Sequence, residues 1–172
     1  MDEIEIAPYD PDWPAAFERE RSRLTAAITD IAILDLVHFG STAMANMPAK
    51  PIIDMLMIVP DLAHARAVLP ERLDTFGYDF WADNPKTDRL FFVRGMPPRG
   101  DRRTHHLHVC EPGSEMHQRL AFLDYLIAHP DEAAAYADLK RDLAMRHRTD
   151  REAYTRAKQA FVDRIMRFAG EA

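Results

Sequence analysis

One segment of the chain, His38–Asp54, collects the residue types that could do chemistry. It contains the pair Gly40-Ser41, the lysine Lys50 and one aspartate, Asp54, embedded in apolar residues. A glycine permits close backbone approach, and a hydroxyl with neighbouring N–H groups can hold phosphate oxygens. An aspartate within an apolar strand is costly unless it is paired, hydrogen-bonded or bound to a metal ion. The segment therefore predicts a phosphate-binding turn followed by a carboxylate that has a partner.

A purely structural role is the alternative for the same residues. Gly40 and Ser41 could form an ordinary turn, and Asp54 could cap a neighbouring loop. Gly-Ser with an aspartate 13 positions after the serine is a weak motif on spacing alone. Both interpretations stay open at this level.

Two apolar runs flank the segment and must position it. Residues 33–37 lead in and residues 55–59 lead out, and short apolar runs bounded by turns are typical of buried strands. We expect a strand, a Gly-Ser turn with one helical turn, and a second strand that carries Asp54.

The remaining sequence predicts the other elements. A helix is expected from about residue 12 to 29, and another from residue 62 with a kink or break at Pro70. Further short strands are expected at 4–6, 78–82, 89–94 and 104–110. After Ser114 the pattern is helical, with one helix ending at Pro130, a second reaching about residue 147, and a third beginning at Thr149 or Asp150.

Three histidines lie together in the last of these strands. Alternate residues of a strand share a face, so His106 and His108 point one way and His105 the other. Two imidazoles so spaced can bind one metal ion, and Asp54 is the natural carboxylate to complete the set. The alternative is that these histidines are hydrogen-bonding residues in a polar cleft, or simply face solvent.

Positive charge gathers beside the same strand. Between residues 84 and 106 there are six basic residues and two acids, a balance of +4 within a chain of net charge −6. Arginine pairs well with phosphate through its planar guanidinium group. Arg89 and Arg94, which flank a strand, are the predicted phosphate ligands, and a solvated charged loop is the alternative.

The motifs His38–Ala43 and Ala49–Asp54 together resemble the signature of the GrpB family. The likeness extends along nearly the whole chain, including Tyr9–Pro14, His106–Val109 and Phe122–Leu126. That family is placed in the DNA polymerase beta-like nucleotidyltransferase superfamily. The resemblance implies a nucleotidyltransferase-like fold, with Asp54 and Ser41 as catalytic residues.

The same resemblance implies a ligand and a metal. Gly40, Ser41, Thr42 and Lys50 would hold the phosphates of a nucleotide or small phosphorylated molecule. Superfamily members carry two carboxylates one residue apart, and a third on an adjacent strand, which together hold two magnesium ions.

This chain departs from that carboxylate pattern. The positions two away from Asp54 are Ile52 and Leu56, and the strand of the third carboxylate offers His106 and His108. Because imidazole suits zinc or manganese better than magnesium, we expect Asp54, His106 and His108 to hold one divalent ion, Mg, Mn or Zn.

Composition limits the number of domains, the classes of ligand and the cellular location that the chain can have. With 172 residues, 47% of them hydrophobic and 29% charged, the chain predicts one soluble domain over 1–172, with an α/β core at 1–113 and a helical extension at 114–172. The net charge of −6 argues against broad nucleic-acid binding. One cysteine excludes an intrachain disulfide framework, and the lack of a long apolar run or signal-peptide pattern predicts a cytoplasmic protein without membrane association.

The expected class is therefore α+β, with a mixed sheet of about five strands packed by helices and a C-terminal helical extension. Three functions remain open: a nucleotidyltransferase-like enzyme, a non-catalytic nucleotide- or anion-binding module, and a metal-dependent hydrolase that uses Asp54, His106 and His108.

Overall fold

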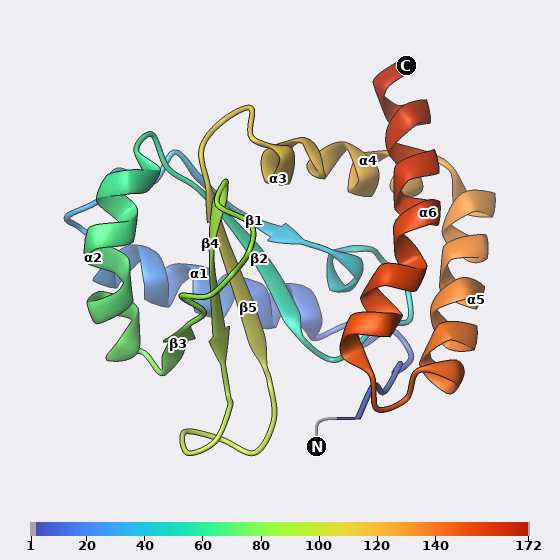
Figure 1. Cartoon of the computed structure of the whole chain (residues 1–172), viewed down its shortest axis with the longest axis horizontal. Helices are drawn as coiled ribbons and strands as arrows, with labels where there is room; N and C mark the ends of the chain where they lie inside the picture. Colours follow the sequence, from blue (N-terminus) through green and yellow to red (C-terminus); the bar gives the residue numbers. More distant parts are fainter. Residues whose placement is uncertain (1–2, 172) are drawn as a thin grey trace.

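The computed structural model describes residues 3–171 and has five strands and six α-helices in that range (Figure 1). The strands are β1 (Asp35–Phe39), β2 (Ile53–Ile58), β3 (Tyr78–Phe80), β4 (Arg89–Arg94) and β5 (His105–Cys110). The helices are α1 (Trp13–Ala27), α2 (Leu62–Asp74), α3 (Glu115–Gln118), α4 (Leu120–Ala128), α5 (Pro130–Arg146) and α6 (Arg151–Glu171), with a 3₁₀ turn, η1 (Ser41–Ala43). The α+β class predicted from the sequence is confirmed.

All five strands form one mixed sheet in the order β1-β2-β5-β4-β3. The β2–β5 pair is parallel, and the β1–β2, β4–β5 and β3–β4 pairs are antiparallel. The two central strands are separated by about fifty residues of chain, so their pairing depends on the β-α-β crossover and not on a hairpin.

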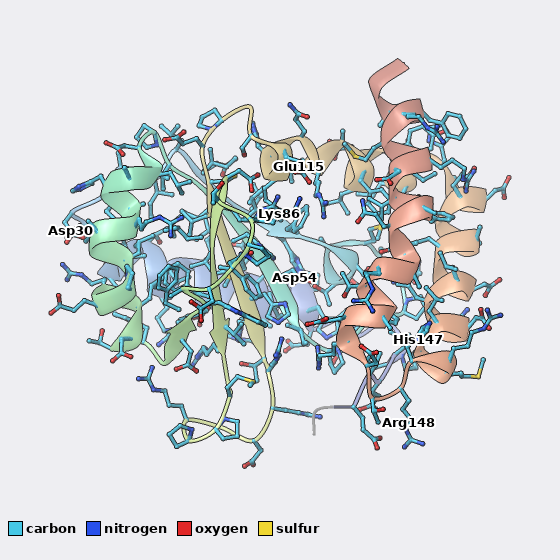
Figure 2. The ribbon with its side chains drawn as sticks, viewed as in Figure 1. Asp30, Asp54, Lys86, Glu115, His147 and Arg148 are labelled. Carbon is cyan, nitrogen blue, oxygen red and sulfur yellow. The ribbon has the colours of Figure 1, made fainter. Side chains whose placement is uncertain are left out.

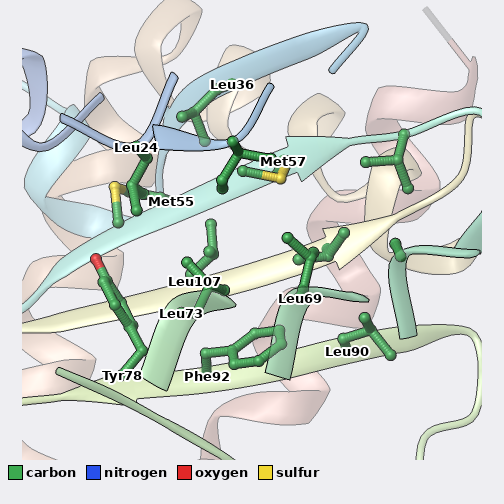
Figure 3. Packing of buried hydrophobic residues seen from close by; sticks show 14 of the residues in the cluster. Leu24, Leu36, Met55, Met57, Leu69, Leu73, Tyr78, Leu90, Phe92 and Leu107 are labelled. Atoms are coloured by element: carbon green, nitrogen blue, oxygen red, sulfur yellow. The ribbon is translucent and has the colours of Figure 1, made fainter. Parts of the chain in front are cut away.

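One face of the sheet carries the main core. Alternate residues of β2, β4 and β5 point to this face, where α1 and α2 cover them (Figure 3). The fully buried side chains there include Leu24, Met55, Leu69, Phe92 and Leu107. Burying such side chains contributes about 1.5–3 kcal/mol each relative to exposure, which makes this face the main source of stability.

The opposite face of the sheet lies on the side of the C-terminal helices. Met44 and Met47, which follow the η1 turn, pack in a second cluster with Leu126 of α4, Tyr136 of α5 and Ile165 of α6. Helices α5 and α6 lie side by side at one edge of the molecule, as Figure 1 shows in orange and red. The helical extension is therefore anchored on the loop that carries the Gly-Ser pair.

Three sequence expectations are corrected at the level of elements. Helix α2 continues through Pro70, because buried Leu69 and Leu73 hold it on the core although the proline removes one backbone donor. The expected strand at 4–6 is reduced to one bridge between Ala7 and Ala49, and Ile4 bonds to Arg148. The helix after Ser114 is divided at Arg119 into α3 and α4.

Several predicted boundaries hold. Ser114 caps α3 by accepting a hydrogen bond from the His117 N–H, and α6 begins at the residue after Asp150. The segment between the two central apolar runs contains one 3₁₀ turn. No helix within residues 3–171 has the length and apolar character needed to cross a membrane.

A buried charged cluster fastens α1 to the covered face. Glu20, 5% exposed, accepts hydrogen bonds from Arg23 at 2.7 Å, from the Tyr78 hydroxyl at 2.9 Å and from Arg94 at 3.0 Å. Burial acts to raise the pKa of Glu20, but the hydrogen bonds from Arg23 and Tyr78 and the charge of Arg94 outweigh it and lower that pKa. The ionised carboxylate is thus the form that the fold stabilises.

Replacing Glu20 with Gln tests this cluster. We expect Glu20→Gln to lower the free energy of unfolding by about 2–3 kcal/mol, less than for a fully buried ion pair because both arginines are about one-third exposed. The exposed Glu18→Gln should change it by less than about 0.5 kcal/mol. Chemical denaturation at pH 7 measures both.

The effect should also depend on pH. Since the folded pKa of Glu20 lies below the ordinary 4.5, the stabilisation is present above pH 4.5 and is lost as the pH falls through the lowered value. If Glu20→Gln lowered the free energy of unfolding by the same amount below the lowered pKa as at pH 7, the stabilising role of the ionised Glu20 would be contradicted.

Candidate functional site

The second face of the sheet brings Asp54 and His106 together. In the parallel pairing of β2 with β5, Asp54 lies directly beside His106, and both side chains point away from the α1–α2 core. The His106 imidazole donates from Nδ1 to Asp54 Oδ1 at 2.8 Å. Figure 2 shows Asp54 on β2 with α6 in front of and beside it. Two sequence-predicted residues, 52 positions apart in the chain, therefore form one unit.

The environment of Asp54 keeps it ionised. Burial acts to raise the pKa of the carboxyl group, but the hydrogen bond from His106 and the nearby charge of Lys50 outweigh it, so the pKa lies below its ordinary value. The side chain is still 30% exposed. Because an ionised carboxylate can only accept, Nδ1 of His106 carries the proton that is donated to Asp54.

Gly40 makes room for this carboxylate. It has φ +70° and ψ −164°, a conformation that is essentially restricted to glycine, and it ends β1 directly before η1. A Cβ at this position would lie 2.8 Å from Asp54 Oδ2. The glycine of the Gly-Ser pair is therefore required both by its backbone and by the approach of Asp54.

Ser41 and Thr42 take different directions from that turn. Thr42 is 1% exposed and its hydroxyl lies 2.9 Å from His38 Nε2, so it supports the turn from within. Ser41 instead faces the C-terminal helices, where its hydroxyl accepts a hydrogen bond from Lys140 at 2.9 Å. Of the predicted phosphate ligands, Ser41 lies on the Asp54 side and Thr42 does not.

Two lysines from the helical extension meet Lys50 beside this turn. Lys140 of α5 is 2% exposed and bonds to the Ser41 hydroxyl and the Pro48 carbonyl. Lys158 of α6 lies 4.6 Å from the Tyr154 ring centroid, and Lys50 lies 5.0 Å from the centroid of the same ring. Lys140 thus contacts the Gly-Ser turn directly, and Lys158 and Lys50 lie together at the Tyr154 ring.

Burial and mutual repulsion perturb two of these amines. The pKa of Lys140 falls to about 7, first through burial and then through the charges of Lys158, Arg141 and Lys50. The pKa of Lys158 also falls to about 7, through burial and the charge of Lys50. Within residues 3–171 neither lysine forms an ion pair with a carboxylate, and Asp54 is the acid whose charge acts on Lys158.

Sequence reasoning missed Lys140 and Lys158, although the helical pattern held the signal. Lys140 occupies the stripe of α5 that also contains Tyr136 and Leu143, and Lys158 occupies the stripe of α6 between Tyr154 and Phe161. Each lysine therefore stands where an apolar residue is expected. A lysine inside an apolar stripe indicates a buried cation, which is rare without a partner.

The two predicted arginines lie elsewhere. Arg94 points to the covered face, where it bonds to Glu20, so the structure does not bring it to Asp54. Arg89 is on the Asp54 face but 6% exposed, and it pairs with Asp88 at 2.9 Å and lies 3.7 Å from Glu115 of α3. These arginines hold elements together, because nearby carboxylates already balance their charge.

The histidines divide as the strand period predicts, with His106 and His108 on one face and His105 on the other, near Glu20. The His108 ring stacks on Phe91 with centroids 4.7 Å apart, and burial lowers its pKa to about 3, so it is neutral. Two buried nitrogens, His106 Nε2 and His108 Nδ1, have no hydrogen-bond partner in the described part of the chain.

The predicted metal ligands are Asp54, His106 and His108, and their nitrogen and oxygen atoms can be compared with what a metal ion needs. Free imidazole nitrogens suit zinc or manganese, but Asp54 already accepts from His106, and no three His, Cys, Asp or Glu side chains in residues 3–171 are grouped to hold an ion. A two-magnesium centre needs several carboxylate oxygens, and Asp54 is the one that this site supplies. The residues of this site therefore do not fit a two-magnesium centre.

Replacing Gly40 with Ala tests the packing of the turn on Asp54. We expect Gly40→Ala to lower the free energy of unfolding by about 1–3 kcal/mol and to displace the Asp54 carboxylate from His106. The NMR signal of the His106 Nδ1 proton should then shift or broaden. Gly77→Ala is the control, because Gly77 also has positive φ but an added Cβ would meet no atom within 4 Å. An unchanged His106 signal in Gly40→Ala would contradict the predicted contact.

The comparisons with known proteins show the family and the fold of the chain. The sequence profile of the family described as GrpB protein matches residues 3–167. A UPF0157 protein of Pseudomonas aeruginosa is 47% identical over 96% of this chain and 67% of its own length. The crystal structure of a conserved GrpB protein from Enterococcus faecalis is 31% identical and aligns with a TM-score of 0.84 over 96% of each chain.

A protein of Mycolicibacterium paratuberculosis named dephospho-CoA kinase is 33% identical over 91% of this chain, which spans 43% of that protein. The profile match covers nearly the whole sequence, and the P. aeruginosa relative and the E. faecalis structure match it over almost its full length. The chain therefore belongs to the GrpB family.

Proposed function

We propose that this protein binds a nucleotide or another small phosphorylated molecule, with the phosphates held between the Gly40-Ser41 turn and helices α5 and α6. Ser41 and the backbone of the turn supply hydrogen bonds, and Lys50, Lys140 and Lys158 supply positive charge. Asp54 and His106 lie at the edge of this phosphate site.

The observation that carries the proposal is a charge imbalance. Lys140 and Lys158 lie close enough for the charge of Lys158 to act on Lys140, and Asp54 is the carboxylate whose charge acts on Lys158. Removing an ammonium group from water is costly unless an opposite charge compensates it. An anionic ligand would provide that compensation, and phosphate oxygens match the donors already present.

The position of the lysines argues for phosphate over a carboxylate ligand. A lysine amine can bind several oxygens as a point charge, and the Ser41 hydroxyl lies beside one of these amines, so the set suits a group with several charged oxygens. The dephospho-CoA kinase name of one relative describes an activity on a nucleotide-containing molecule, which is consistent with a phosphorylated ligand.

A transferase acting on the bound molecule is the second candidate, and the Asp54–His106 bond favours it. His106 donates Nδ1–H to Asp54, so in this candidate a ligand that gains access to the buried Nε2 transfers to it the proton of a hydroxyl group, while the hydroxyl oxygen bonds to phosphorus and displaces the leaving group with its electron pair. Ser41 would then orient the phosphate, and Asp54 would stabilise the charged imidazole. The binding site is common to both candidates.

Charge-removing variants test the binding proposal. We expect Lys140→Met and Lys158→Met each to weaken binding of ATP by about tenfold or more, measured by calorimetry at constant ionic strength without divalent ions. Their thermal stability should change little or increase, because Lys140→Met removes a buried charge and Lys158→Met a half-buried one. Lys86→Met is the control, since Lys86 is a surface lysine paired with Glu115.

A different result would assign Lys140 a structural role. If Lys140 only joins α5 to the Ser41 loop, Lys140→Met should lower stability and leave ATP binding as in the wild type. Failure of the wild-type protein to bind ATP or tripolyphosphate would overturn the proposed function itself.

Binding should also be coupled to protonation. In the free protein Lys140 and Lys158 have pKa values of about 7, and a bound phosphate favours their charged forms and so raises both values. Protons should therefore be taken up on binding, and affinity should fall as the pH rises from 7.5 to 9, where the phosphates are already fully ionised. Calorimetry in buffers of different ionisation enthalpy measures the uptake. The Lys140→Met/Lys158→Met double variant should take up few protons on binding. Proton uptake equal to that of the wild type would exclude these two amines as the groups that are protonated.

A further inference from the structure

An exposed tryptophan lies on the same face of the sheet as Asp54. Trp81 directly follows β3, donates its backbone N–H to the Phe91 carbonyl of β4 at 2.9 Å, and is 47% exposed. Its ring lies 5.8 Å from the Phe91 ring, measured between centroids. An exposed aromatic ring offers a flat face on which a nucleic-acid base can stack.

A continuous row of rings joins Trp81 to the candidate phosphate site. Phe91 contacts Trp81 on one side and His106 on the other, with the Phe91 and His106 centroids 5.1 Å apart. His106 in turn bonds to Asp54. These contacts run from β3 across β4 and β5 to β2, which is the order of the strands in the sheet.

The span of this row suits one small molecule. Trp81 and Asp54 are three strand spacings apart across the sheet and two residues apart along the strands, so their backbones are separated by about 16 Å. An extended nucleotide has a planar base at one end and its phosphates at the other, so a single ligand can reach both ends of the row. In Figure 1 the segment after β3 crosses in front of β4.

Positive charge accompanies the tryptophan as well. The Arg103 guanidinium carbon lies 5.8 Å from the Trp81 ring centroid. Arginine and tryptophan together form a surface on which planar aromatic groups stack, because both present flat faces and the cation adds electrostatic attraction.

We propose that Trp81, supported by Phe91 and Arg103, is the stacking site for the base of a nucleotide whose phosphates occupy the Gly40-Ser41 turn. This inference rests on the proposed phosphate site and narrows its ligand from phosphorylated molecules in general to nucleotides. The aromatic row then selects the ligand, and the lysines supply most of the attraction.

Fluorescence and two probes test the inference. The chain has two tryptophans, and the other one, Trp13, is 6% exposed in the opposite core, so a stacked base should quench the emission of Trp81. ATP should quench and should bind more tightly than tripolyphosphate, which carries phosphates without a base. Divalent ions are left out of both titrations.

Variants then separate the base from the phosphates. Trp81→Leu should weaken ATP binding by about tenfold, to the level of tripolyphosphate, and leave tripolyphosphate binding unchanged. Trp81→Phe should recover part of the affinity because it keeps an aromatic face. Phe168→Leu, at an aromatic position 40% exposed on α6, is the matched control and should bind ATP like the wild type.

The outcomes of these titrations distinguish the stacking site from the phosphate site. Equal affinity of ATP and tripolyphosphate, unaffected by Trp81→Leu, would overturn the stacking site and leave the phosphate site in place. Binding of neither probe would overturn both. A loss of tripolyphosphate binding in Trp81→Leu equal to the loss of ATP binding would also contradict the inference, since stacking cannot act on a ligand without a base.

Discussion

The hydrogen bond between Asp54 and His106 is the constraint on which the rest of this face depends. It places an ionised carboxylate on a strand whose other residues are apolar, and it needs the parallel register of β2 with β5 to exist. The carboxylate then leaves no space for a Cβ at residue 40, which explains why a glycine ends β1. The shape of the Gly-Ser turn and the position of Ser41 follow from that contact.

The two faces of the sheet differ in how well their polar groups are satisfied. On the covered face, Glu20 has three hydrogen-bonded partners and Arg94 is one of them. On the other face, Lys140 bonds to neutral oxygens, and an imidazole nitrogen of His106 is buried without a partner. Proteins keep such unbalanced groups mainly where a ligand completes them. The contrast between the faces therefore marks the second face as the candidate site independently of any motif.

The charge of the site also distinguishes it from the metal centre that the nucleotidyltransferase resemblance implies. A site built for two magnesium ions gathers carboxylates and uses the metals to attract phosphate. Here one carboxylate is accompanied by Lys50, Lys140 and Lys158, so the protein itself carries the positive charge. Because two of these amines come from α5 and α6, the helical extension completes the site as well as covering part of the sheet.

Local sequence determined much of this protein. Strand alternation separated His105 from His106 and His108, and the Gly-Ser pair and the apolar surroundings of Asp54 marked the central segment. These inferences succeed because side-chain direction in a strand and glycine-specific backbone depend on neighbours in the chain. Tertiary structure alone decided the rest. Arg94 faces Glu20 and not the site, and Lys140 reaches Ser41 across 99 positions of sequence, because strand order and helix docking depend on the burial of distant surfaces that no local pattern encodes.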